Sequence, residues 1–130
     1  MLFTLHLLLM PIATAGIIAG VSAAIFFRKK KNWLKIHKLL NSTGILVMSF
    51  GITMAFIYIS GSGGRHLNGL HQTIGVTALI VAFVTLLLGF HQFKAKNKPL
   101  VRTMHRWLGR FSLLLILTAI TLGLMLINIL

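Results

Sequence analysis

Histidine is the side chain in this sequence best suited to chemistry. The chain holds six histidines but no aspartate, glutamate or cysteine. Carboxylate acid–base pairs, triads that need a carboxylate, thiolate nucleophiles and carboxylate-lined magnesium or calcium sites therefore cannot be built from this chain alone. Neutral imidazole binds transition metals strongly, so the positions of the histidines decide which chemistry to expect.

Four of the six histidines recur at one place in the sequence pattern, at or near the start of a long apolar stretch. These helix-start histidines are His6, His37, His71 and His105. In a bundle of four antiparallel helices, the histidines at the starts of the first and third helices lie at one depth, and those of the second and fourth helices lie at another. Two imidazoles that face each other can ligate the iron of a flat macrocycle from both sides. The spacing predicts two b-type haems, held by His6 with His71 and by His37 with His105.

Small residues follow the helix-start histidines on the same helical faces, since positions four and seven residues on share a face. They would let a porphyrin lie against the backbone. They would equally let membrane helices approach closely, and Gly16-x-x-x-Gly20 is itself a packing motif. The small residues in question are Ala13, Gly20, Gly44, Gly51, Gly75, Ala78, Gly109 and Ser112.

Cations near the second and fourth histidines fit the same interpretation. A haem has an apolar ring and two anionic propionates that prefer the membrane edge, and Lys38, Arg102 and Arg106 are predicted to pair with the propionates of the inner haem. Contact with anionic lipid headgroups is the alternative for each cation. His91 lies on the opposite helical face from His71 and is not expected to be a ligand.

Four long apolar stretches position these side chains. At about 1.5 Å of rise per residue, each can cross a hydrocarbon core of about 30 Å as a helix. The predicted fold is all-α, a membrane-spanning up-down four-helix bundle in one domain over residues 1–130, with helices at about 2–27, 36–60, 68–93 and 103–130. A cleavable signal peptide is disfavoured because no basic residue precedes the first stretch. The stretches are Leu2–Phe27, Leu39–Ser60, Leu70–Phe93 and Trp107–Leu130.

The distribution of lysine and arginine predicts the orientation. The segments Arg28–Lys38 and Lys94–Arg110 hold twelve of the 13 cations, whereas the Ser60–Leu70 loop holds only Arg65. The positive-inside rule places both basic segments in the cytoplasm and both termini on the non-cytoplasmic side of the plasma (inner) membrane. Contact with the lipid bilayer explains this charge, and no nucleic-acid partner is expected.

Four fragments of the sequence, in this order, resemble the cytochrome b561 family, whose four-helix core also occurs fused to DOMON domains. The resemblance covers the whole chain and implies bis-histidine ligation of two b haems and electron transfer across the membrane. The family's ligand pairs fall on His6 with His71 and on His37 with His105. The fragments are residues 6–11 (HLLLMP), 36–38 (IHK), 71–75 (HQTIG) and 105–109 (HRWLG).

The chain also departs from the family pattern. Animal and plant members have six helices, and Leu7 stands where related first-helix motifs often have glycine. The family's ascorbate contacts are not recognisable, so Arg65, His66 and Asn68 are candidates for an outer substrate site. The spacing from His6 to His37 is similar to that from His71 to His105, which indicates two related hairpins.

The predicted function is transmembrane electron transfer between a redox donor and acceptor on opposite faces, and whether the chain is itself an oxidoreductase stays open. The alternative is a haem-free membrane anchor or assembly subunit that recruits a partner through its basic loops. A histidine-lined metal or solute carrier is disfavoured, because the helix centres offer only small hydroxyls such as Thr53 and Thr85. A homo-oligomer or a subunit of a larger redox complex is expected.

Overall fold

The computed structural model describes all 130 residues, and these form four helices and no strand. The helices are α1 (Leu2–Phe26), α2 (Trp33–Gly61), α3 (Leu70–His91) and α4 (Lys98–Leu126). Each is long and apolar enough to cross a membrane. The predicted all-α class is therefore confirmed, and the chain is a multi-pass membrane protein.

Two helices begin earlier than their apolar stretches indicated. α2 begins at Trp33 and α4 at Lys98, because lysine and arginine are good helix formers and continue a helix beyond the apolar part. The side chain of Asn97 accepts a hydrogen bond from the backbone N–H of Leu100 at 3.2 Å. This cap, together with Pro99 in the first turn, fixes where α4 begins.

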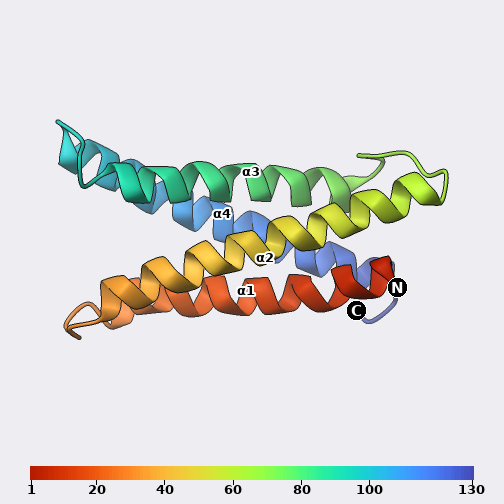
Figure 1. Cartoon of the computed structure of the whole chain (residues 1–130), viewed down its shortest axis with the longest axis horizontal. Coiled ribbons are helices and arrows are strands. Elements are labelled where there is room, and N and C mark those ends of the chain that lie inside the picture. The colour runs from red at the N-terminus through yellow and green to blue at the C-terminus, as the bar shows by residue number, and fades with distance from the viewer. The chain divides into compact units, whose positions relative to one another are not determined.

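The helices pack as two hairpins, α1 against α2 and α3 against α4. The first hairpin lies within residues 1–68 and the second within residues 69–130. In Figure 1 the red-to-orange α1 runs alongside α2, and the green α3 runs alongside the blue α4, antiparallel in both cases. This division agrees with the two related hairpins that the histidine spacing indicated.

The first hairpin depends on a close approach of two backbones at Gly44. A Cβ atom at Gly44 would lie 2.7 Å from Cγ1 of Ile17 and 3.1 Å from the backbone oxygen of Ala13. Ala13, Ile17 and Met48 are buried around this point. In the second hairpin small side chains take the same role, since Ala78, Ala82, Ser112 and Ala119 are buried.

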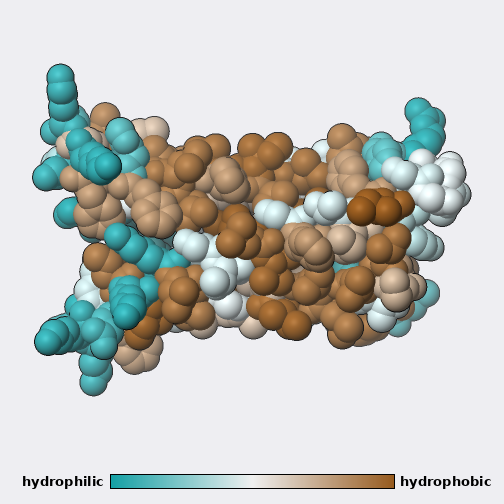
Figure 2. All heavy atoms as spheres, viewed as in Figure 1, coloured by the Kyte–Doolittle hydropathy of each residue, from teal (hydrophilic) through white to brown (hydrophobic).

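Large apolar side chains point outward along both hairpins. Leu46, Phe50 and Trp107 are each at least 60% exposed. Figure 2 shows apolar atoms covering the length of the helices, with hydrophilic atoms at their ends. In a bilayer, lipid tails cover such surfaces, so helix association relies on close packing of small residues instead of apolar burial from water.

The approach at Gly44 predicts a large effect from a single methyl group. Gly44→Ala should lower the free energy of unfolding by about 1–3 kcal/mol, because the added Cβ overpacks the contact with Ile17 and Ala13. Gly61→Ala is the matched control, since no atom lies within 4 Å of its Cβ position. Unfolding by SDS titration, followed by far-UV circular dichroism, measures both; equal stability of the two variants would contradict the packing assigned to Gly44.

Candidate functional site

Each helix-start histidine donates a hydrogen bond from Nδ1 to a backbone carbonyl of the helix that it packs against. A carbonyl oxygen can only accept, so Nδ1 carries the hydrogen and the lone pair of the neutral imidazole lies on Nε2. Metal-ligating histidines are oriented in this way, with the second ring nitrogen donating to a carbonyl or carboxylate. The four bonds, each 2.9 Å, join His6 to Gly51, His37 to Gly20, His71 to Ala119 and His105 to Thr85.

The four hydrogen bonds follow one register. In every helix the accepting carbonyl comes at the same spacing after that helix's own histidine. This spacing is close to four helical turns, so both positions lie on one face, about 21 Å apart along the axis. Each helix therefore presents a histidine near its start and receives its partner's histidine further along. The histidine and the accepting residue of each helix are His6 and Gly20, His37 and Gly51, His71 and Thr85, and His105 and Ala119.

Small residues lie midway between the two histidine levels of each hairpin. Ala13, Gly44, Ala78 and Ser112, each seven residues after a helix-start histidine, are all buried. The contacts at Gly44 show that in the first hairpin this position serves helix packing. The sequence left two explanations open for the small residues, and at Gly44 the contacts support helix packing.

Two glycines that the sequence interpretation missed lie directly against histidine rings. A Cβ atom at Gly123 would lie 2.9 Å from Cε1 of His71, and one at Gly89 would lie 2.9 Å from Cε1 of His105. Both glycines come at the same spacing after the histidine of their own helix, and the first hairpin has alanine at that spacing, Ala24 in α1 and Ala55 in α2. A small residue at this spacing in all four helices is the sequence signal that could have identified them.

The first hairpin adds a polar neighbour to one histidine. Asn41 donates from Nδ2 to the backbone oxygen of His37 at 2.7 Å, and the same Nδ2 lies 3.2 Å from Nδ1 of His37. Because the Nδ1 hydrogen is directed to Gly20, this contact brings the positive end of an amide dipole to the ring. The side chain of Asn41 lies where Gly20 lacks a Cβ. The equivalent position is Met10 after His6, Gly75 after His71 and Gly109 after His105.

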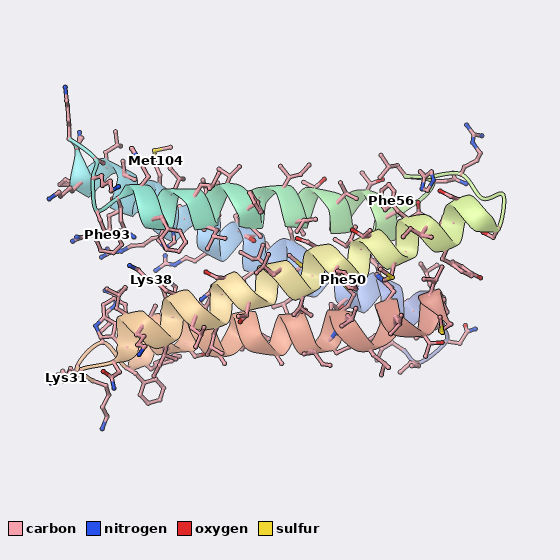
Figure 3. All side chains as sticks on the ribbon, viewed as in Figure 1. Lys31, Lys38, Phe50, Phe56, Phe93 and Met104 are labelled. Carbon is pink, nitrogen blue, oxygen red and sulfur yellow. The ribbon has the colours of Figure 1, made fainter.

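The cations predicted to pair with propionates lie near the second and fourth histidines. Lys38 follows His37 on α2 and is half-buried, near the loop that joins α1 to α2 (Figure 3). Arg102 and Arg106 are exposed on the first turns of α4, on either side of His105 in the sequence.

The three residues of the candidate outer site are all exposed in the segment between α2 and α3. His66 packs back on the end of α2, where its Nε2 lies 3.0 Å from Oγ of Ser60. Its ring stacks on Phe56, with centroids 4.8 Å apart and an interplanar angle of 11°. Figure 3 shows Phe56 on α2 close to this segment. Arg65 and Asn68 flank His66 in the sequence, and His91 is exposed at the end of α3.

Membrane-length helices that carry histidines with an oriented Nε2 are characteristic of membrane-embedded haem proteins. A family model described as eukaryotic cytochrome b561 matches residues 5–129. The chain belongs to this family, and the resemblance noted in the sequence is confirmed. No curated protein and no solved structure matches the chain. Membership implies haem b and haem-based electron transfer across a membrane, and it does not favour a haem-free anchor.

The contact between Gly123 and His71 generates a prediction about haem retention. In Gly123→Ala the added Cβ must displace the rigid ring from the carbonyl of Ala119. With His71 as a haem ligand, haem retention should then weaken roughly 10–100-fold, as when a group that orients a metal ligand is lost. Transfer of haem to excess apomyoglobin measures the loss, and Gly89→Ala should act in the same way on His105. Gly61→Ala is the control; retention equal to that of Gly61→Ala would show that the ring position does not matter.

Proposed function

We propose that this chain carries electrons across the membrane through two b-type haems, each ligated by one histidine from each hairpin. His6 and His71 would hold one haem, and His37 and His105 the other. The observation that supports this most is the set of four equivalent Nδ1–carbonyl hydrogen bonds, which present Nε2 for ligation at two depths.

The pairing follows from depth and topology. Within one hairpin the two histidines lie about 21 Å apart along the helix axis, so they cannot ligate the same iron. Two-sided ligation then needs one histidine from each hairpin. Four successive membrane crossings put the starts of α1 and α3 at one face and the starts of α2 and α4 at the other. The two hairpins would therefore form one domain.

The residues present fit two haems. The neutral imidazole with its hydrogen on Nδ1 is the donor that haem iron takes in bis-histidine sites. Gly75, one turn after His71, has no atom within 4 Å of its Cβ position, and Gly109, one turn after His105, has only Cγ2 of Thr85 at 3.6 Å. This leaves room beside both histidines for a flat ligand. Lys38, Arg102 and Arg106 would neutralise propionates at the inner haem.

When bound, haem supplies the one-electron Fe(III)/Fe(II) couple. The chain's own residues hold the ligating imidazoles in a fixed orientation, because each Nδ1–H donates to a main-chain carbonyl that is part of a helix. With its hydrogen on Nδ1, each imidazole would offer the lone pair of Nε2 to the iron. The apolar surfaces of the helices keep water and other ligands away from the irons.

The orientation of the chain in the membrane determines which haem lies near which face. We place the loops that join α1 to α2 and α3 to α4 in the cytoplasm and both termini outside, by the positive-inside rule. The haem of His6 and His71 would then lie near the outer face, with the segment that carries Arg65, His66 and Asn68 beside a donor or acceptor. The inner haem would exchange electrons with a partner at the basic surface.

The optical spectrum of the purified protein tests the haem number and the ligands together. The wild type should show sharp reduced b-type bands and two haems per chain by pyridine haemochrome assay. Replacing His6 or His71 with alanine, or His37 or His105, removes one ligand of a pair and should reduce the count toward one.

His66→Ala and His91→Ala serve as matched controls, because both histidines are exposed and lie outside the proposed pairs. Both controls should keep two haems. A folded, colourless wild-type protein after haem-replete expression would refute the relay and favour a membrane anchor that recruits a partner through its basic loops.

Asn41 predicts that the two haems differ in potential. The amide dipole beside His37 favours the less positive Fe(II) state of the inner haem, as hydrogen-bonding groups around a ligand do elsewhere. Asn41→Leu should lower that midpoint by roughly 30–60 mV, equivalent to about a three- to tenfold shift in a one-electron equilibrium. Potentiometric titration with optical detection resolves the haems, and His6→Ala identifies the inner one. An unchanged inner midpoint in both Asn41→Leu and Asn41→Ala would refute this role.

A further inference from the structure

The register of the second hairpin places Arg110 deep in the membrane. His71 lies level with Ala119 and His105 with Thr85, so each step along α4 matches one step back along α3. Arg110 is therefore level with Ile80. Helix α3 begins at Leu70, ten residues before Ile80, and ends at His91, eleven residues after it. At about 1.5 Å per residue, Arg110 lies about 15 Å from either end of an apolar helix that spans the bilayer.

Arg110 faces away from α3. It precedes the buried Ser112 by two residues, which is about 200° around the helix. Its guanidinium lies over the ring of Trp107, 5.2 Å from the centroid, and both residues are exposed. Trp107 is level with Phe83, which is eight residues before His91, so the charged group remains about 12 Å below the end of α3.

A guanidinium at this depth needs an anionic partner. Charged groups in the hydrocarbon region are unfavourable by about 2.5 kcal/mol or more. In known membrane proteins they pair with one another or with backbone carbonyls, and they face a bundle interior or a water-filled cavity. The indole face of Trp107 offers only a partial interaction. Lipid phosphates lie at the membrane surface, farther away than an arginine side chain reaches by snorkelling without thinning the bilayer.

This chain cannot supply the partner itself. It contains no aspartate or glutamate, so neither its own helices nor those of a second copy offer a side-chain carboxylate. The propionates of the proposed inner haem are also unsuitable, because Arg110 is five residues, or about 140° around the helix, from His105 and points away from the ligating face.

We propose that the face of α4 around Arg110, which points away from α3, binds a transmembrane helix of a different protein, and that this helix carries an aspartate or glutamate at the depth of Arg110. Trp107, Phe111 and Leu114 are 51–65% exposed around the arginine and form the apolar part of the surface. A bidentate arginine–carboxylate pair satisfies both charges and fixes the depth of the partner helix. The inference goes beyond the relay and does not depend on the number of haems.

Site-specific photo-crosslinking in native membranes tests this surface. A photoreactive phenylalanine analogue replaces Leu114, one turn after Arg110, in the full chain, and mass spectrometry identifies what it captures. The expected product joins α4 to an apolar segment of another protein that contains aspartate or glutamate. It should be lost in Arg110→Leu and Arg110→Gln, and kept in Lys98→Leu, which removes a cation at the start of α4. The same analogue at Leu87, which is 57% exposed on α3, controls for nonspecific capture.

Several results would overturn the proposal. Crosslinks to lipid, to residues 1–68 of this chain or to a second copy, an absence of crosslinks, or a product that persists in both Arg110 variants would each do so. Far-UV circular dichroism of the purified variants shows whether they are folded. Because the readout is a crosslinked peptide, it stays informative even if the haem assay fails.

Discussion

The rest of the structure depends on one interaction, the hydrogen bond from a histidine Nδ1 to a main-chain carbonyl of the neighbouring helix. It occurs four times at 2.9 Å and crosses each helix pair at two levels. In lipid there is no water to satisfy a buried imidazole, so an unmade bond would leave a polar group in hydrocarbon. Each bond thus fixes both the sliding register of two helices and the orientation of an imidazole ring. In the proposed relay these rings would be the haem ligands, so the same hydrogen bonds would serve both packing and function.

The register explains why the small residues are arranged as they are. Once the histidine of each helix meets a carbonyl near the far end of its partner, the two helices must approach midway between the two histidine levels. Gly44 has no space for a Cβ at this point, and Ala78 is buried at the equivalent position of the second hairpin. Gly89 and Gly123 then let the rings of His105 and His71 lie against the backbone. At Gly44, Gly89 and Gly123 small size is required by a specific neighbour.

Much of the fold and of the candidate site could be predicted from the sequence, because long apolar stretches and the positions of histidines can be read from it directly. The four helices, the helix-start histidines and their family were all inferred from residue types and spacing. The carbonyls that accept the histidine hydrogen bonds could not be predicted, because every residue has a backbone carbonyl. Nothing about the side chains of glycine, alanine or threonine marks a residue for that role. The repeated small residue that marks Gly89 and Gly123 is visible in the sequence, but their contacts with the histidine rings needed the structure. Residues 71 and 123 become neighbours only when α3 and α4 take one particular register.

The charged residues show that a sequence pattern predicts the depth of a side chain in the membrane poorly. Counting cations put Arg110 with the basic segment that begins at Lys94, because lysine and arginine usually mark the membrane surface. Helix α4, however, begins at Lys98 and its first turns already lie beside apolar turns of α3. The positive-inside rule counts charges near helix ends and does not measure depth. Depth follows from the pairing of helices, which here is set by the histidine bonds. The interaction that orients the imidazole rings therefore also shows that Arg110 lies deep in the membrane.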